Sequence, residues 1–433
     1  MFVVFAFFIL QAMGTFLIKD LIVNEVAYGV FLLLTAIIAV SIYLFRNLEK
    51  ELLMIIYIGF ALRIIILLVD LYVPAIKVFS SGDDSEYFHT ASVSIAEGLL
   101  PVSEGRTAYV PFLAAIYAVV GDQRPFAQFM NIAFWAFSAV YLIKTLYYLK
   151  IDHKIIIFSM LIFTFLPNSI FMASILLRES IIIFCITLSL YCFVRWFFEQ
   201  NFWQFGTAVA LALVSMIFHS GMIGFVIAYL IVFIFLNQRK NVKEKNSFSR
   251  ILYLLFFASL FILIFQNSEL FLEKFSVLEE EGIENLELSG RGGSMYLAGL
   301  NGLTGWVVYL LAPIKMFYFL FSPLPGDWRG LGDMVSFFAD AVFYMLLLGI
   351  TIYGIVKSEL SLQNKIVIAT FLFITVLIYS YGTQNAGTAM RHRNKLMPLI
   401  LISYGIMQNQ LLRKSAAEKI SIFKNSKRGE VKS

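Results

Sequence analysis

Long apolar runs alternate with short polar connections along most of the chain. Many of these runs approach the roughly 20 residues that a helix needs to cross a bilayer, whereas a transmembrane β-barrel would alternate polar and apolar residues in short strands. The pattern therefore predicts an all-α polytopic membrane protein with about twelve transmembrane helices. The expected spans are about 1–18, 26–45, 52–72, 126–148, 155–172, 175–197, 205–218, 221–237, 251–266, 334–356, 366–383 and 396–411.

Two further apolar segments do not fit as simple spans. Residues 109–120 are apolar but short, and Pro111 and Gly121 bound them, which favours a helix lying at the membrane interface. Residues 303–321 contain Pro313 and Lys315, so this segment could span, re-enter or lie flat. Counting it as a full span would place the basic C-terminal tail outside, so we do not count it.

The positions of Lys and Arg predict the orientation of the spans. Basic residues fill the connection 238–250 and the tail 412–433, and cytoplasmic loops carry an excess of Lys and Arg. Both segments are therefore expected in the cytoplasm. The acid-rich loops, about 73–125 and 267–333, are then expected outside. Residues 1–411 would form one transmembrane domain of the cytoplasmic (plasma) membrane, followed by the tail.

Composition narrows the class of protein. Hydrophobic side chains make up 60% of the chain and charged ones only 14%, which excludes a water-soluble enzyme. The only two cysteines, Cys185 and Cys192, lie seven apart in one apolar run and indicate neither a disulfide framework nor a metal site. No glycine-rich phosphate loop lies on the predicted cytoplasmic side, which disfavours ATP-driven transport. We expect no nucleic-acid partner, and we expect any chemistry on the outer face.

The first outer loop carries a group of polar side chains that could perform catalysis. Asp83, Asp84, Glu86 and His89 follow the apolar run 52–72. Three carboxylates and a histidine at a membrane surface could abstract a proton or hold a divalent ion. Asp and Ser are equally typical of a solvated helix N-terminus, so the spacing alone leaves both interpretations open.

This loop resembles the first outer loop of the GT-C superfamily of integral membrane glycosyltransferases, such as the protein O-mannosyltransferases (glycosyltransferase family 39) and the aminoarabinose transferases of lipid A. The resemblance rests on Asp83-Asp84, Tyr87 and Ala91, then Glu97-Gly98, the segment 109–113 and Gly121. It implies that Asp83 is the catalytic base and that Asp84 stands where many members have Glu. It also implies substrate contacts from Glu86, Tyr87 and His89. A divalent metal ion on Asp83, Asp84 and Glu86 is compatible with the resemblance, but some members work without one, so none is claimed.

Weaker similarity continues downstream. Leu166-Pro167 and then Arg178-Glu179 resemble the proline-bearing span of the family and the acid that opens its next helix. His219-Ser220 stands where members often place an outer Arg-Pro pair. The segment 391–398 resembles the basic motif that opens the last span in many members. Through this resemblance Arg178, Glu179 and His219 become candidate substrate-binding residues.

The basic motif also has a physical interpretation of its own. Arg391, Arg393 and Lys395 lie beside an apolar span, where Arg can bind a lipid phosphate with two hydrogen bonds and Lys as a point charge. Snorkelling to the headgroups is the alternative. We favour phosphate binding, because these cations lie on the predicted outer side.

Three other charged residues require an interpretation. Arg63 and Asp70 lie seven apart in one span and share a helix face, which predicts a structural pair with partners in the bundle. Arg291 begins a glycine-bearing segment in the second outer loop and is a candidate substrate contact. Arg291 and Gly302 also match a spacing found in membrane polysaccharide polymerases of the Wzy type.

The sequence thus predicts a glycosyltransferase of surface polysaccharide or glycoconjugate synthesis in the cell envelope. It would move a sugar from a polyprenyl-phosphate or pyrophosphate donor to the hydroxyl of a glycan, lipid or protein acceptor. Two alternatives stay open: a Wzy-type polymerase that relies on arginines, and a flippase or transporter of lipid-linked sugars without chemistry. Bulky loops on one side favour an enzyme, and the halves of the chain show no convincing repeat of the kind found in transporters.

Overall fold

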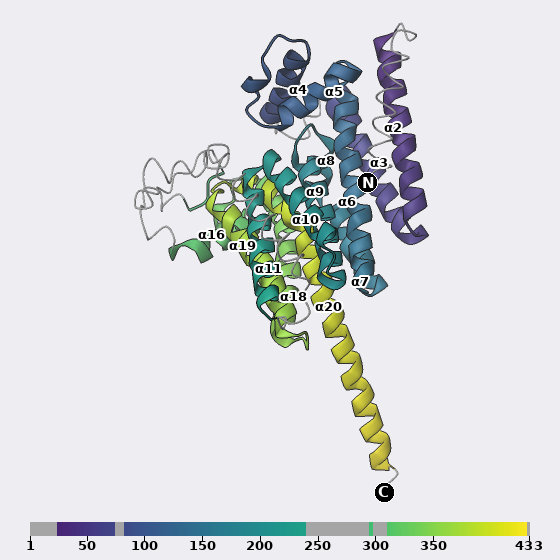
Figure 1. Cartoon of the computed structure of the whole chain (residues 1–433), viewed down its shortest axis with the longest axis vertical. Coiled ribbons are helices and arrows are strands. Elements are labelled where there is room, and N and C mark those ends of the chain that lie inside the picture. The colour runs from purple at the N-terminus through teal and green to yellow at the C-terminus, as the bar shows by residue number, and fades with distance from the viewer. Residues whose placement is uncertain (1–23, 74–81, 240–293, 298–309, 431–433) are drawn as a thin grey trace. The chain divides into compact units, whose positions relative to one another are not determined.

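A computed structural model of the chain describes residues 24–73, 82–239, 294–297 and 310–430 (Figure 1). The side chains of residues 82–83, 237–239 and 416–430 lie outside this description. Within these ranges all regular elements are helices, apart from one isolated antiparallel bridge between Met295 and Asn385. The described chain forms two compact units, residues 1–143 with 160–187 and residues 144–159 with 188–433, and each is described by itself.

The predicted all-α polytopic fold is confirmed. Six helical segments of the described chain are long and apolar enough to cross a membrane, and a seventh candidate is a bent helix pair. The total of twelve spans remains a prediction, because the runs 1–18 and 251–266 lie outside the described residues. The six segments are α2 (Glu25–Asn47), α3 (Lys50–Tyr72), α6 (Arg124–Tyr148), α9 (Glu179–Glu199), Leu331–Lys357 and α19 (Leu362–Tyr381).

In the first unit, α2 and α3 show how an apolar sequence selects a packed face. Asn24 caps α2 by accepting hydrogen bonds from the backbone of Val26 and Ala27. The residues of α2 that are buried recur every four positions, which places them in one stripe, and the other apolar side chains stay exposed, as expected for a helix beside lipid. This stripe consists of Tyr28, Leu32, Ala36, Val40 and Leu44.

The bent pair is α7 (His153–Phe165) and α8 (Pro167–Ser174), which meet at 54°. Pro167 lacks a backbone N–H, so the helix breaks there. Arg63 of α3 donates to the carbonyl of Thr164 at 3.0 Å and to Ser169 Oγ at 3.1 Å. The predicted pairing of Arg63 with Asp70 is wrong in detail, because Asp70 instead accepts a hydrogen bond from Gln128 Nε2 at 2.9 Å.

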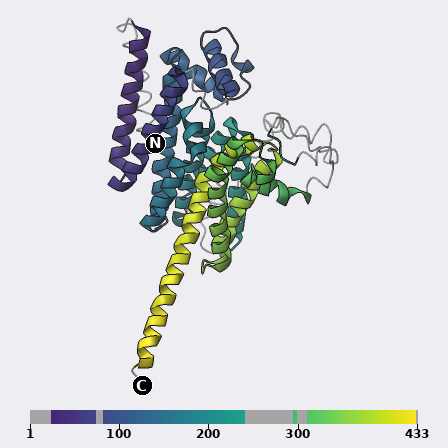
Figure 2. The same cartoon turned by 180° about the vertical axis from the view of Figure 1, so that it is seen from behind.

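The segment predicted as the first outer loop contains two helices. In the first unit, α4 (Gly82–Ala96) packs against α5 (Tyr109–Val120), and the two lie side by side in Figures 1 and 2. A 3₁₀ turn, η2 (Val102–Glu104), lies between them. Gly121 ends α5 with φ at +77°, a conformation that favours glycine. The predicted short helix therefore has the bounds that Pro111 and Gly121 indicated.

The second unit gathers the remaining helices. These include α10 (Phe202–Phe218), the 3₁₀ turn η3 (Ser220–Met222), α11 (Ile223–Arg239), α16 (Ala312–Phe321), η6 (Pro325–Asp327), α17 (Leu331–Ser336), the π-helical turn η7 (Phe337–Ala341), α18 (Val342–Lys357) and α20 (Ala386–Glu430). At 1.5 Å per residue, the 10 residues of α16 extend about 15 Å, so α16 alone is too short to span a bilayer. Residues 303–309 of that segment lie outside the description.

The last helix, α20, is longer than the predicted span 396–411. It begins at Ala386, so the basic motif forms its first turns, and Pro398 lies inside the helix rather than opening it. It continues without a break past residue 411, and in Figures 1 and 2 it extends beyond the ends of α18 and α19.

Candidate active site

Two clusters of polar side chains contain four of the candidate residues: Glu86, Tyr87, His89 and His219. The outer-loop cluster lies in the first unit and consists of Glu86, His89, Tyr117, Asp122 and Arg124, and Tyr87 on the same helix accepts a hydrogen bond from the Arg106 backbone at 3.0 Å. The histidine cluster lies in the second unit and consists of His219, Tyr379, Thr383 and His392.

Contacts between α4 and α5 position the outer-loop cluster. Ser92 Oγ of α4 donates to the carbonyl oxygen of Val110 on α5 at 3.0 Å. The rings of Phe88 and Tyr109 pack edge to face, with centroids 5.2 Å apart. These buried contacts fix one face of α4, and its opposite face presents the polar side chains.

Glu86 is held by an arginine that the sequence analysis did not single out. Arg124, the first residue of α6, donates to both carboxylate oxygens of Glu86, at 2.9 and 2.6 Å. The hydrogen bonds from Arg124 hold the pKa of the Glu86 carboxyl below its usual range. Glu86 is therefore ionised at neutral pH and committed to an ion pair, which makes it a poor candidate for a general base.

His89 bridges two partners in the same cluster. Its Nδ1 lies 3.0 Å from the Tyr117 hydroxyl, and its Nε2 lies 3.7 Å from Asp122 Oδ1. Burial lowers the pKa of His89, and the Asp122 carboxylate opposes that effect. We therefore expect a neutral imidazole at pH 7, which can exchange a proton with a substrate hydroxyl.

The two predicted catalytic acids lie in the first turn of α4. Asp84 is exposed there, and Asp83 is the second residue of the helix, although its side chain lies outside the description. A helix N-terminus stabilises negative charge, so this position favours a carboxylate. The metal ion considered for Asp83, Asp84 and Glu86 is not tested, because the Asp83 side chain lies outside the described residues; of the three, Glu86 is already bound through both carboxylate oxygens to Arg124.

A buried acid lies behind the hairpin of α4 and α5. Glu179, the first residue of α9, is only 1% exposed, and its charge acts on the Tyr109 hydroxyl. That hydroxyl donates to Asn131 Oδ1 at 3.3 Å, while Asn131 Nδ2 donates to the Ile175 carbonyl at 2.8 Å. Arg178, which is half-buried, immediately precedes Glu179.

The histidine cluster joins residues that are far apart in the sequence. His219, which follows α10, places Nε2 3.0 Å from Nε2 of His392 on α20. His219 Nδ1 accepts from the Gly221 backbone at 3.1 Å, and the ring stacks on Tyr379. His392 Nδ1 lies 2.9 Å from Thr383 Oγ1. Two facing Nε2 atoms at this distance fit one hydrogen bond, in which one Nε2 carries the proton and the other accepts it.

The basic motif separates into side chains with different roles. Arg393 is fully buried, and its Nε and Nη2 both donate to Asp340 Oδ2. Its Nη1 donates to the carbonyls of Leu320, at 3.2 Å, and Ser322, at 2.5 Å. These partners leave the guanidinium no fork for a phosphate, so we reassign Arg393 to holding α16, η7 and α20 together. Arg391 is half-buried and Lys395 is buried.

Arg291 lies outside the described residues, but a short segment that follows it is described. Tyr296 N donates to the Gln384 carbonyl at 3.0 Å, and Ala386 N donates to the Ser294 carbonyl at 2.8 Å. Tyr296 Oη also donates to the carbonyl of Thr383 at 2.6 Å. The segment 294–297 is thus bound beside the histidine cluster.

Sequence reasoning missed Arg124, Tyr117 and Tyr379. Arg124 carried a usable signal, since it is a cation beside a proline where a span begins. The two tyrosines carried none, because aromatic residues are frequent throughout this chain and only packing distinguishes these positions.

One segment of the chain matches a known protein family. Residues 117–278 match the family described as dolichyl-phosphate-mannose-protein mannosyltransferase. The predicted resemblance to this glycosyltransferase family is confirmed. No curated protein and no solved structure matches the chain significantly.

The matched segment overlaps unequally with the candidate residues. It begins within α5 and includes Tyr117, Arg124, Glu179 and His219. It ends before the segment 294–297 and includes neither Asp83 nor the basic motif. The match supports a membrane glycosyltransferase, whereas the individual roles of Asp83 and Arg391 rest on the local arguments above.

Proposed function

We propose that the chain transfers a sugar from a polyprenyl-phosphate or pyrophosphate donor to an acceptor hydroxyl at the outer face of the cytoplasmic membrane. The observation that carries this proposal is the match of residues 117–278 to a family named for a lipid-phosphate-linked sugar and a protein acceptor. A lipid-linked donor also suits a chain with several helices able to cross the membrane.

In the proposed reaction the acceptor oxygen attacks the anomeric carbon. Asp83 takes the proton from the acceptor hydroxyl as the new C–O bond forms, and the electron pair of the breaking bond leaves with the lipid phosphate. Arg391, which is half-buried in the first turns of α20, neutralises the charge of that phosphate. A single displacement without an enzyme nucleophile inverts the anomeric carbon.

Ion pairing within the outer-loop cluster supports the choice among its acids. Arg124 neutralises Glu86, so protonating Glu86 during catalysis would weaken a two-point ion pair. Asp83 instead lies in the first helical turn of α4, where the backbone N–H groups favour an ionised carboxylate. His89 is expected to orient the acceptor through its neutral ring.

The test begins with deletion of the gene and identification of the lipid-linked sugar that accumulates. With that lipid as donor, Asp83→Asn should lower turnover by about two to four orders of magnitude, the usual range for a general base. Glu86→Gln is the matched control in the same helix and should cost much less. Near-normal turnover in Asp83→Asn would remove the base assignment and favour an arginine-based polymerase.

Membrane orientation is tested separately, because it underlies the proposed outer face. Single cysteines introduced at Glu281 and Gly387 should react with a membrane-impermeant thiol reagent added to intact cells. A cysteine at Asn241 should react only after permeabilisation. Reaction at Gly387 only after permeabilisation would place the basic motif in the cytoplasm and overturn the proposed outer site.

A further inference from the structure

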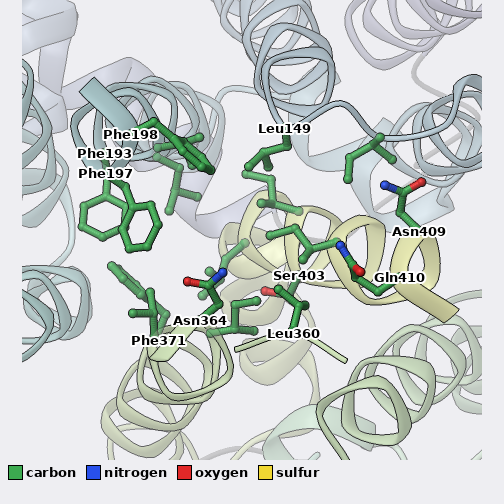
Figure 3. Close-up of a pocket in the computed structure, with 18 of the residues that line it drawn as sticks. Leu149, Phe193, Phe197, Phe198, Leu360, Asn364, Phe371, Ser403, Asn409 and Gln410 are labelled. Carbon is green, nitrogen blue, oxygen red and sulfur yellow. The ribbon is translucent and has the colours of Figure 1, made fainter. Parts of the chain in front are cut away.

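An apolar cavity of about 230 Å³ lies within the second unit (Figure 3). It is bounded by the C-terminal half of α9, the N-terminal half of α19, α20 and the turn between α6 and α7. Its surface is mostly aliphatic and aromatic, with four phenylalanines from α9 and α19: Phe193, Phe197, Phe198 and Phe371. A lining of this kind suits a hydrocarbon chain.

The polar atoms of the cavity are few and come mainly from α20 between Ser403 and Arg413. Figure 3 shows Ser403, Asn409 and Gln410 on the side opposite the phenylalanines. Asn364 of α19 lies between Phe371 and Ser403 in this view. Arg413 completes the lining and is exposed. The cavity therefore has an apolar body and a polar, positively charged margin.

The margin is fixed to the α6–α7 turn by hydrogen bonds. The Asn409 side chain donates to the Lys150 carbonyl at 3.3 Å and accepts from the Asp152 backbone at 3.2 Å. Arg413 Nη2 also donates to the Lys150 carbonyl, at 3.4 Å. Lys150 lies between Leu149 and Ile151, which both line the cavity, so these hydrogen bonds to its carbonyl hold Asn409 and Arg413 at the margin.

The cavity is remote from the histidine cluster along the same helices. On α19 it involves residues from Asn364 to Phe371, whereas Tyr379 of the histidine cluster lies two turns further on. On α20 it involves residues from Leu399 to Arg413, after His392. The charge distribution predicts that the cavity end of these helices is cytoplasmic.

We propose that this cavity binds an anionic phospholipid, with one acyl chain among the phenylalanines and the phosphate at Arg413. Arg pairs with phosphate through two parallel hydrogen bonds, and anionic lipids are concentrated in the cytoplasmic leaflet. Each buried methylene adds to the binding free energy, so a tail and a headgroup contact reinforce each other. A sugar fits poorly, because the body of the cavity offers it few hydrogen-bond partners.

The proposal does not depend on the glycosyltransferase function and is tested by binding alone. The purified full chain is placed in phosphatidylcholine vesicles that contain a trace of phosphatidylglycerol with a diazirine on one acyl chain, and the cross-linked peptides are mapped. Cross-links should fall on the lining segments of α9, α19 and α20. Unlabelled phosphatidylglycerol should compete.

Two variants and their controls test separately whether the apolar body and the charged margin of the cavity contribute to lipid binding. Val194→Trp fills the cavity from α9 and should lower cross-linking about tenfold, whereas Val356→Trp places the same residue at an exposed position of α18 and should leave it within about twofold. Arg413→Gln should weaken phosphatidylglycerol binding about tenfold, equivalent to about 1.4 kcal/mol, the scale of one charge-assisted hydrogen bond. Arg46→Gln, at an exposed arginine at the end of α2, should leave binding unchanged.

Three results would overturn the proposal. Cross-linking that survives Val194→Trp would place the lipid elsewhere. Equal cross-linking by a phosphatidylcholine that carries the same diazirine, with no effect of Arg413→Gln, would show an apolar space without a headgroup site. Displacement by polyprenyl phosphate at lower concentrations than by phosphatidylglycerol would make the cavity a site for an isoprenoid chain instead.

Discussion

Two acid–arginine pairs in this protein have similar chemistry and opposite environments. The Glu86 and Arg124 side chains are 57% and 20% exposed, whereas those of Asp340 and Arg393 are 3% and 0% exposed. An exposed pair contributes little to stability, and removing one partner of a buried pair leaves an uncompensated charge. The first pair can therefore open or adjust near a substrate, while the second is a fixed part of the helix packing.

The difference explains why the basic motif cannot be treated as one phosphate site. Arg391 and Arg393 lie two residues apart at the start of α20, so they point to different sides of the helix. The buried Arg393 side chain donates to Asp340 of η7 and to the carbonyls of Leu320 and Ser322 at the end of α16. Of the two arginines, Arg391, on the other side of the helix, remains the candidate for binding the donor phosphate.

The largest expected effect comes from breaking the buried pair. Asp340→Asn leaves the Arg393 charge buried without a counter-charge, and we expect the free energy of unfolding to fall by about 3–5 kcal/mol. Asp333→Asn is the matched control, since Asp333 of α17 pairs with Arg329, whose side chain is 50% exposed. Its cost should stay below about 1 kcal/mol.

Thermal unfolding of both variants in detergent, followed by size-exclusion chromatography, measures this difference. Equal midpoints for Asp340→Asn and Asp333→Asn would mean that the buried pair is not a fixed part of the packing. The contrast between the two acid–arginine pairs would then have no energetic basis.

A second prediction separates the two arginines of the basic motif. Arg391→Lys keeps the charge but loses the planar two-point contact, so donor binding should weaken by about 1–3 kcal/mol with little change in thermal stability. Arg393→Lys should do the reverse, because a lysine cannot reach Asp340 and both carbonyls together. Its folded fraction should bind the donor normally.

Measuring the donor-lipid affinity and the thermal midpoint of both variants tests this difference between Arg391 and Arg393. Unaltered affinity in Arg391→Lys would mean that Arg391 only reaches the headgroups, as a snorkelling cation does. Weakened donor affinity in well-folded Arg393→Lys would return Arg393 to the phosphate site.

The sequence predicted the helical elements well, because apolar runs and breakers act locally. The proline and glycine that bound α5 defined it closely, and Pro167 marked the bend between α7 and α8. The start of α20 was predicted ten residues late, since the charged residues 391–395 interrupt the apolar run without interrupting the helix. Their charges are accommodated by packing partners that hydropathy does not register.

The site was predicted by residue type rather than by partner. Glu86, His89, Glu179 and His219 were all named as candidates, but none of their contacts was. Arg124 meets Glu86 across 38 positions, and His392 meets His219 across 173. Such pairs depend on the tertiary fold, and the spacing of residues along a single chain carries no direct record of them.

The smallest predicted effect concerns the pH dependence of the exposed cluster. Burial lowers the pKa of His89, so the unfolded chain takes up a proton before the folded hairpin does as the pH falls below about 6.5. Stability of the α4–α5 hairpin should therefore be full above that pH and decline below it.

The pKa of Glu86, lowered by its hydrogen bonds from Arg124, adds a second decline in hairpin stability below about pH 4.3. Hydrogen exchange of the α4 amides, corrected for intrinsic rates, measures both declines in stability. His89→Gln should remove the decline that begins near pH 6.5 and leave the one that begins near pH 4.3. A hairpin that gains protection between pH 7 and 5 would show that Asp122 outweighs burial and that the folded state holds the His89 proton.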